Sequence, residues 1–131
     1  MIQRPTATGI ILCEQVIEAK GTNALTYVNC FREIRSPTFP TPPVRFTMHT
    51  VLTDGLGTWE VTQLIARPDT LESIFSRKLG VKFTDPLSER MFVAKIRGLS
   101  FPVPGRYQVS VLADGEPIAQ CVLNLLRRGK S

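Results

Sequence analysis

The chain has 131 residues, of which 43% are hydrophobic and 21% are charged, and its formal net charge is +5. This composition excludes a disordered tail, and the length predicts one domain over residues 1–131. No apolar run reaches the roughly 18 residues of a membrane-spanning helix, and the N-terminus lacks the apolar core of a signal peptide. We therefore expect a cytoplasmic protein without a membrane partner, with flexible ends at 1–7 and 127–131.

Two strand-like segments open the chain. Thr8–Lys20 carries two candidate apolar registers, which fits either a doubly buried strand or a strand with a bulge. Gly21-Thr22-Asn23 is a turn cluster, and Ala24–Ile34 follows as a second strand. We predict that the two segments pair as an opening hairpin.

A proline-rich segment then divides the chain. Ser36–Pro43 holds four of the ten prolines. Because proline donates no backbone hydrogen bond, this segment is predicted to be an extended connection that crosses from one sheet to another. After it, Val44–Leu52 and Thr58–Arg67 alternate in polarity around a glycine-containing turn, which predicts a second hairpin.

The middle of the chain is ambiguous between strand and helix. Leu71–Lys78 fits a helical apolar stripe, but Leu79–Phe83 alternates as a strand does. We predict strand or irregular edge for the first segment and strand for the second, with one short helix as the alternative. Glu89–Gly98 is a further strand, with Phe92 and its alternate neighbours facing inward.

The end of the chain predicts a closing β-hairpin over Phe101–Leu126, turned at Asp114-Gly115. We expect a three-residue loop with a bulge, which pairs Val109 with Ala119 and brings the apolar residues of both strands to one face. In all, the pattern gives an all-β fold of about 7–9 short strands and at most one short helix, which favours a β-sandwich.

Short motifs along the chain carry a resemblance to known proteins. They are Cys13-Glu14, Tyr27–Phe31, Phe39-Pro40, Leu52–Gly55, Val81–Pro86, and Phe101–Tyr107 with Asp114-Gly115. In these residues the chain resembles a family of small uncharacterised bacterial proteins, single immunoglobulin-like sandwiches catalogued as a domain of unknown function. The resemblance implies an immunoglobulin-like β-sandwich in the bacterial cytoplasm. It implies no activity and no site residues.

The three cysteines do not suggest a site. Cys13, Cys30 and Cys121 are widely spaced, and an odd number at such spacing suits neither a disulfide framework nor a zinc site. We expect small buried side chains in a reducing compartment. Cys13 and Cys30 lie on strands predicted to be adjacent, which can bring them close together.

Catalytic and metal sites are not predicted. His49 is the only histidine, and its place in an alternating strand points it outward without a motif around it. The aspartates Asp54, Asp69, Asp85 and Asp114 sit in turns beside Gly or Pro, where a turn-forming role is favoured over a calcium site. We therefore predict a protein that is not an enzyme and has no catalytic, cofactor-binding or metal-binding residues.

A local excess of basic residues is the one charge feature. From Arg67 to Arg106 eight bases stand against four acids, and the C-terminal tail adds more. Such a face suits an anionic partner, but solubility and protection of strand edges are the favoured explanation. The candidate polyanion-binding residues are Arg77, Lys78, Lys82, Arg90, Lys95, Arg97, Arg127 and Arg128.

Three function classes follow from the sequence. The first is a non-enzymatic protein-interaction module that binds another protein or itself. The alternative is a binder of nucleic acid or another polyanion, which the absence of interleaved exposed aromatics disfavours. A carbohydrate-binding module ranks last, because it needs a row of exposed aromatics, whereas Trp59 and Tyr27 are predicted to be buried.

Overall fold

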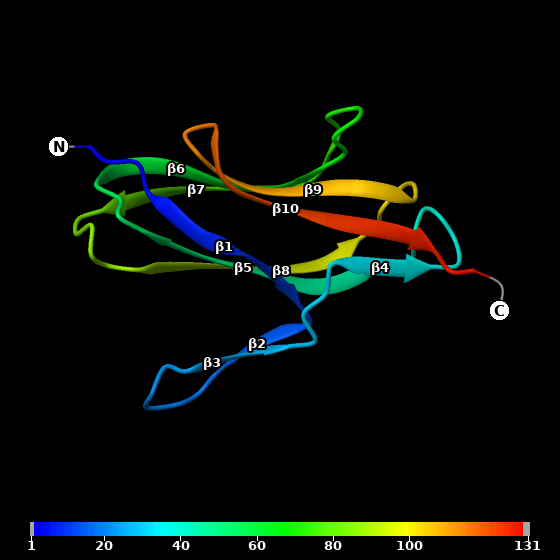
Figure 1. Cartoon of the computed structure of the whole chain (residues 1–131), viewed down its shortest axis with the longest axis horizontal. Coiled ribbons are helices and arrows are strands. Elements are labelled where there is room, and N and C mark those ends of the chain that lie inside the picture. Colours follow the sequence, from blue (N-terminus) through cyan, green and yellow to red (C-terminus); the bar gives the residue numbers. More distant parts are fainter. Residues whose placement is uncertain (1, 130–131) are drawn as a thin grey trace.

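The computed structural model describes residues 2–129, which form ten β-strands and no helix (Figure 1). None of these residues forms a helix able to cross a membrane. The all-β prediction is therefore confirmed. The strands are β1 Thr6–Cys13, β2 Gln15–Glu18, β3 Leu25–Val28, β4 Glu33–Ser36, β5 Val44–Thr53, β6 Gly57–Ala66, β7 Ser73–Phe83, β8 Arg90–Leu99, β9 Gly105–Ala113 and β10 Glu116–Arg127.

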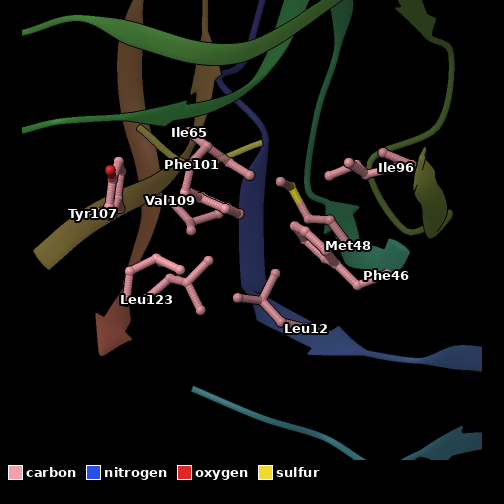
Figure 2. Packing of buried hydrophobic residues seen from close by; sticks show 11 residues of the cluster. Leu12, Phe46, Met48, Ile65, Ile96, Phe101, Tyr107, Val109 and Leu123 are labelled. Atoms are coloured by element: carbon pink, nitrogen blue, oxygen red, sulfur yellow. The ribbon is translucent and has the colours of Figure 1, made fainter. Parts of the chain in front are cut away.

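Two sheets make the body of the molecule. The small sheet has the order β1-β5-β8, the large sheet has the order β4-β10-β9-β6-β7, and β2 and β3 form a separate hairpin. Side chains that alternate along each strand fill the space between the sheets. Figure 2 shows this packing, in which Phe46 and Met48 of the small sheet approach Val109 and Leu123 of the large one.

A polar residue lies between the two hydrophobic clusters of the core. One cluster contains Ile65 and Val109, and the other contains Val61 and Val111. Gln63 lies between Ile65 and Val61 on β6, is fully buried, and has no hydrogen-bond partner for its side-chain amide within the described residues. The core is thus two apolar layers separated by an unpaired amide.

The opening of the chain differs from the predicted hairpin. Each expected strand is split in two: Thr8–Lys20 becomes β1 and β2, and Ala24–Ile34 becomes β3 and β4. Only β2 and β3 pair as predicted, whereas β4 runs parallel to β10 in the large sheet. Asn29 has a φ of 51°, a left-handed conformation that ends β3 and redirects the chain. The opening segment therefore changes sheets, and the β2–β3 hairpin is inserted at that change.

The crossing and the ambiguous middle segment follow the predictions. Ser36–Pro43 carries the chain from β4 in the large sheet to β5 in the small one. Thr41 anchors it, because Thr41 N donates to Phe101 O at 3.0 Å and Phe101 N donates to Thr41 Oγ1 at 3.0 Å. Residues 73–83 form strand β7, so the strand interpretation is confirmed and the helical alternative is wrong. Phe92 faces the core, as expected.

The closing hairpin places its apolar residues on one face, as predicted, but with a different turn and register. Its turn has two residues, Asp114 and Gly115, both at positive φ, rather than the predicted three-residue loop. A bulge after Pro117 then shifts the register, so Val109 pairs with Cys121 and not with Ala119. The apolar residues of both strands still share one face, because the bulge inserts one residue as the longer loop would have done.

Residues from both ends of the described chain form backbone hydrogen bonds. Gln3 N donates to Leu56 O at 3.0 Å, and β1 already begins at Thr6. At the other end β10 extends to Arg127, and Arg128 N donates to Ser36 O at 2.8 Å. Residues 1, 130 and 131 of the predicted ends lie outside the described residues.

Candidate interaction surfaces

The outer face of the large sheet is uncharged in the middle of its three central strands. The side chains of β6, β9 and β10 that point away from the core are neutral between Glu60 of β6 and Arg106 of β9, which stand towards opposite ends of this face, and several are apolar. Leu64, Leu112, Val122 and Leu126 are each half-buried on this face. We call it the neutral face, made of Thr62, Leu64, Ala66, Gln108, Ser110, Leu112, Gln120, Val122, Asn124 and Leu126.

Charged residues surround the neutral face without entering it. On the β7 side Lys78 and Lys82 point outward, and on the β4 side Glu33 and Arg35 form a surface ion pair at 3.2 Å. Within the described residues no other element covers the face, and the turns β6–β7 and β9–β10 rise at its two ends (Figure 1). An uncharged centre with a charged rim is the anatomy of a protein–protein interface.

Six of the eight predicted polyanion-binding residues gather at one edge of the sandwich. Strands β7 and β8 form the neighbouring open edges of the two sheets. Within the described residues none of these six bases forms an ion pair. The six are Arg77, Lys78, Lys82, Arg90, Lys95 and Arg97.

Two of those basic side chains donate hydrogen bonds to backbone carbonyls of the neighbouring edge strand. Arg77 Nη1 donates to Val93 O at 2.9 Å, and Arg90 Nη1 donates to Lys82 O at 3.4 Å. Each guanidinium thus reaches from one edge strand to a backbone carbonyl of the other. Open strand edges invite pairing with other chains, and basic side chains at the edge oppose it. Bridging and protecting the two strand edges explains the positions of Arg77 and Arg90 without a bound ligand.

The structure adds a residue that the sequence analysis missed. Arg45 of β5 lies directly opposite Arg97 of β8 in the antiparallel register. With Lys95 and Glu14 these arginines line a groove of about 370 Å³ beside β2. Like charges directly opposite each other destabilise a sheet, so this pair is the strongest electrostatic hint of an anion. Only the register of β5 against β8, which the sequence does not fix, reveals it.

The two remaining predicted residues lie elsewhere, in or just after the end of β10. Between β10 and β7 the large sheet has two further strands. The Arg127 guanidinium stacks 5.4 Å from the centre of the Phe39 ring and donates to Pro37 O at 3.5 Å. Arg127 and Arg128 therefore do not join the basic edge.

The outer face of the small sheet is covered around His49, whereas Arg45, Lys95 and Arg97 on the same face stay exposed. His49 points to this side as its alternation predicts, yet it is only 1% exposed because the β2–β3 hairpin lies against it (Figure 1). Tyr27 of the hairpin meets it edge to face, with ring centres 5.1 Å apart and its hydroxyl 3.2 Å from Nδ1. Burial lowers the pKa of His49, and its Nε2 has no partner among the described residues.

Of the four turn aspartates, Asp85 uses its side chain within its own turn, and the others bond to other segments or form an ion pair. Asp114 Oδ1 accepts a hydrogen bond from Glu60 N at 2.7 Å, and Asp85 Oδ1 accepts one from Leu87 N at 2.9 Å. Asp54 accepts from the Thr6 hydroxyl at 2.8 Å, and Asp69 pairs with Arg67. Across residues 2–129 no group of three or more His, Cys, Asp or Glu side chains is placed to hold a metal ion.

The fold class is identified by one tyrosine hydrogen bond as well as by the two sheets. Tyr107, near the start of β9, donates its hydroxyl hydrogen to Val103 O at 2.7 Å. A tyrosine bonded back to the chain just upstream, at the start of the penultimate strand of a two-sheet sandwich, is the tyrosine corner of immunoglobulin-like domains. The molecule is therefore an immunoglobulin-like β-sandwich.

The chain belongs to a family of unknown function (DUF6941), whose model matches residues 9–126. The expected likeness to small proteins of unknown function is thereby confirmed. No protein with a curated description matches the sequence significantly.

Two solved structures resemble the chain at low sequence identity, and only the first reaches a TM-score of 0.50. The alkylpurine DNA glycosylase AlkC of Pseudomonas fluorescens, solved bound to DNA with an abasic site analogue, is 13% identical with a TM-score of 0.50, over 95% of this chain and 30% of that one. An immunoglobulin-like protein of Pseudomonas aeruginosa is 12% identical with a TM-score of 0.42, over 94% and 97%. This chain spans less than a third of the glycosylase. At such identities the likeness shows the fold alone.

Proposed function

We propose that this protein is a non-enzymatic protein-interaction module that binds another protein chain through the neutral face. The observation that carries the proposal is a sheet face whose three central strands are uncharged between Glu60 and Arg106, while both flanking strands carry charged side chains along the face. Solvated sheet faces usually alternate with charged residues, whereas the centres of interfaces are depleted of them. The half-buried Leu112 lies on the central strand β9 close to the β9–β10 turn, Val122 lies on β10 opposite Gln108, and both supply apolar contact area.

A second copy of the chain is the first partner to test. Size-exclusion chromatography with light scattering, run from low to high micromolar concentration, measures self-association. If the neutral face binds, Leu112→Lys should weaken the association about tenfold or more, because it buries an unpaired charge in the interface. Leu87→Lys is the matched control, since Leu87 is 86% exposed in a loop away from this face.

A monomer at every concentration would leave a different protein as partner. In that case the wild type, Leu112→Lys and Leu87→Lys are each immobilised and exposed to extract of the native cell. A partner retained by the wild type and Leu87→Lys but lost with Leu112→Lys supports the proposal. If no protein discriminates between the two variants, the neutral face is not a docking surface.

The opposed arginines favour one second candidate, binding of a polyanion at the basic edge. Arg45, Lys95 and Arg97 line one groove without an ion pair among the described residues. Affinity for mixed-sequence DNA or heparin should then fall steeply as salt rises, and Arg97→Ser should lower it. Lack of binding at low salt would end this candidate. It ranks second because Arg77 and Arg90 already have backbone partners and Glu14 stands in the groove.

A further inference from the structure

Two cysteines oppose each other at the base of the β2–β3 hairpin. Phe31 N donates to Leu12 O at 3.0 Å, and Glu14 N donates to Val28 O at 2.9 Å. In an antiparallel pair, two such bonds bracket residues that face each other without bonding to one another. Here they bracket Cys13 on one side and the two residues Asn29 and Cys30 on the other, which is the two-against-one arrangement of a bulge.

This geometry suits a disulfide bond. Disulfides span Cα separations of about 4.4–6.8 Å, a range that includes residues facing each other on neighbouring antiparallel strands. Both thiols are free in the structure. Their closeness also shows at Cys13, because burial and, after it, the neighbouring Cys30 raise the pKa of the Cys13 thiol.

The two thiols differ in access to solvent. Cys13 is fully buried behind the hairpin, whereas Cys30 is exposed and lines an open pocket of about 410 Å³. A dissolved oxidant therefore meets Cys30 first, and Cys13 is the nearby thiol that can resolve the product. The third cysteine, Cys121, lines the same pocket but belongs to β10.

We propose that Cys13 and Cys30 form an oxidisable dithiol site that takes hydrogen peroxide as its oxidant. The Cys30 thiolate attacks one peroxide oxygen and becomes a sulfenic acid, and the O–O bond breaks to release the first water. The Cys13 thiolate then attacks the sulfenic sulfur, which forms the S–S bond and releases the second water. Together the thiols lose two electrons and two protons, which the peroxide takes up.

The bond would tie the end of β1 to the segment between β3 and β4. Both ends of the β2–β3 hairpin would then be clamped together, and with them the cover over His49. In a reducing compartment such a bond is transient and reports the redox state. This role goes beyond the proposed protein binding, which uses the opposite outer face of the sandwich.

The test is peptide mapping of the purified full chain after treatment with hydrogen peroxide. Trypsin separates the three cysteines into the peptides 1–20, 21–32 and 107–127, since Arg4 precedes a proline and is not cleaved. The expected product is peptide 1–20 cross-linked to 21–32, with the intact mass lowered by about 2 Da, the mass of two hydrogens.

Two variants make the result decisive without disturbing the buried thiol. Cys121→Ser should form the same cross-link as the wild type, and Cys30→Ser should form none. A cross-link between peptides 21–32 and 107–127 would overturn the proposal. So would oxidation of Cys30 to a sulfinic acid, a gain of about 32 Da, with Cys13 still a free thiol.

Discussion

The two outer faces of the sandwich differ in which of their outward-pointing side chains are buried. The small sheet turns a histidine, Thr47 and Cys13 outward and then buries all three, partly beneath the β2–β3 hairpin. The large sheet turns leucine and valine outward and leaves them half-exposed. Charge and polarity alone would give the reverse, because apolar groups gain more from burial than polar ones. The comparison teaches that the hairpin is a built-in cover for one face and that the other face lacks one.

The largest expected effect comes from loosening that cover. Tyr27→Ala removes the ring that packs against His49 and the hydroxyl bonded to it. We expect a loss of about 2 kcal/mol in the free energy of unfolding, less than for a fully buried aromatic because Tyr27 is only half-buried. Urea unfolding measures the loss. The comparison breaks if Leu112→Ala, on the open face, destabilises the protein as much.

A smaller effect should appear as a pH dependence specific to the covered face. Burial lowers the pKa of His49 in the folded state below the 6.5 of an unfolded chain, so unfolding takes up a proton at mildly acidic pH. Stability is therefore complete above about pH 6.5 and falls as the pH drops towards the folded-state pKa.

The measurement is urea unfolding at several pH values from 5 to 8, on the wild type and on His49→Gln. His49 is the only histidine, so the glutamine variant should lose most of the slope over this range even if its stability at pH 8 is lower. An equal slope in both proteins would mean that His49 is solvated and that the hairpin does not seal this face.

The smallest expected effect on stability is at the neutral face. Leu112→Lys should change the unfolding free energy of the monomer by only about 0.5 kcal/mol, since a partly exposed surface position tolerates a lysine. The same variant is the one that should disrupt binding. Circular dichroism melts below the concentration of any self-association separate the two effects, and a strongly destabilised monomer would show that Leu112 belongs to the core.

Much of the fold and one part of the candidate sites could be predicted from the sequence. Period-two alternation and turn residues were enough for the strands β5, β6 and β7 and for the Asp114-Gly115 turn, because these signals are local. The predicted hairpin between β5 and β6 is wrong, because β5 pairs with β1 and β8 in the small sheet and β6 pairs with β7 and β9 in the large one. The basic residues of β7 and β8 were visible as a charge excess. Arg45 was not, since its pairing with Arg97 depends on how two distant strands align.

The alternating pattern by itself determined that this chain forms strands, where most of them turn, and which side chains share a face. Only the tertiary structure decided which faces are covered. Three features depend on the change of chain direction at Asn29. They are the parallel pairing of β4 with β10, the burial of His49 and the opposition of Cys13 to Cys30. The sequence of a strand determines how its polar and apolar residues alternate. Which strand pairs with it depends on contacts between residues far apart in the chain.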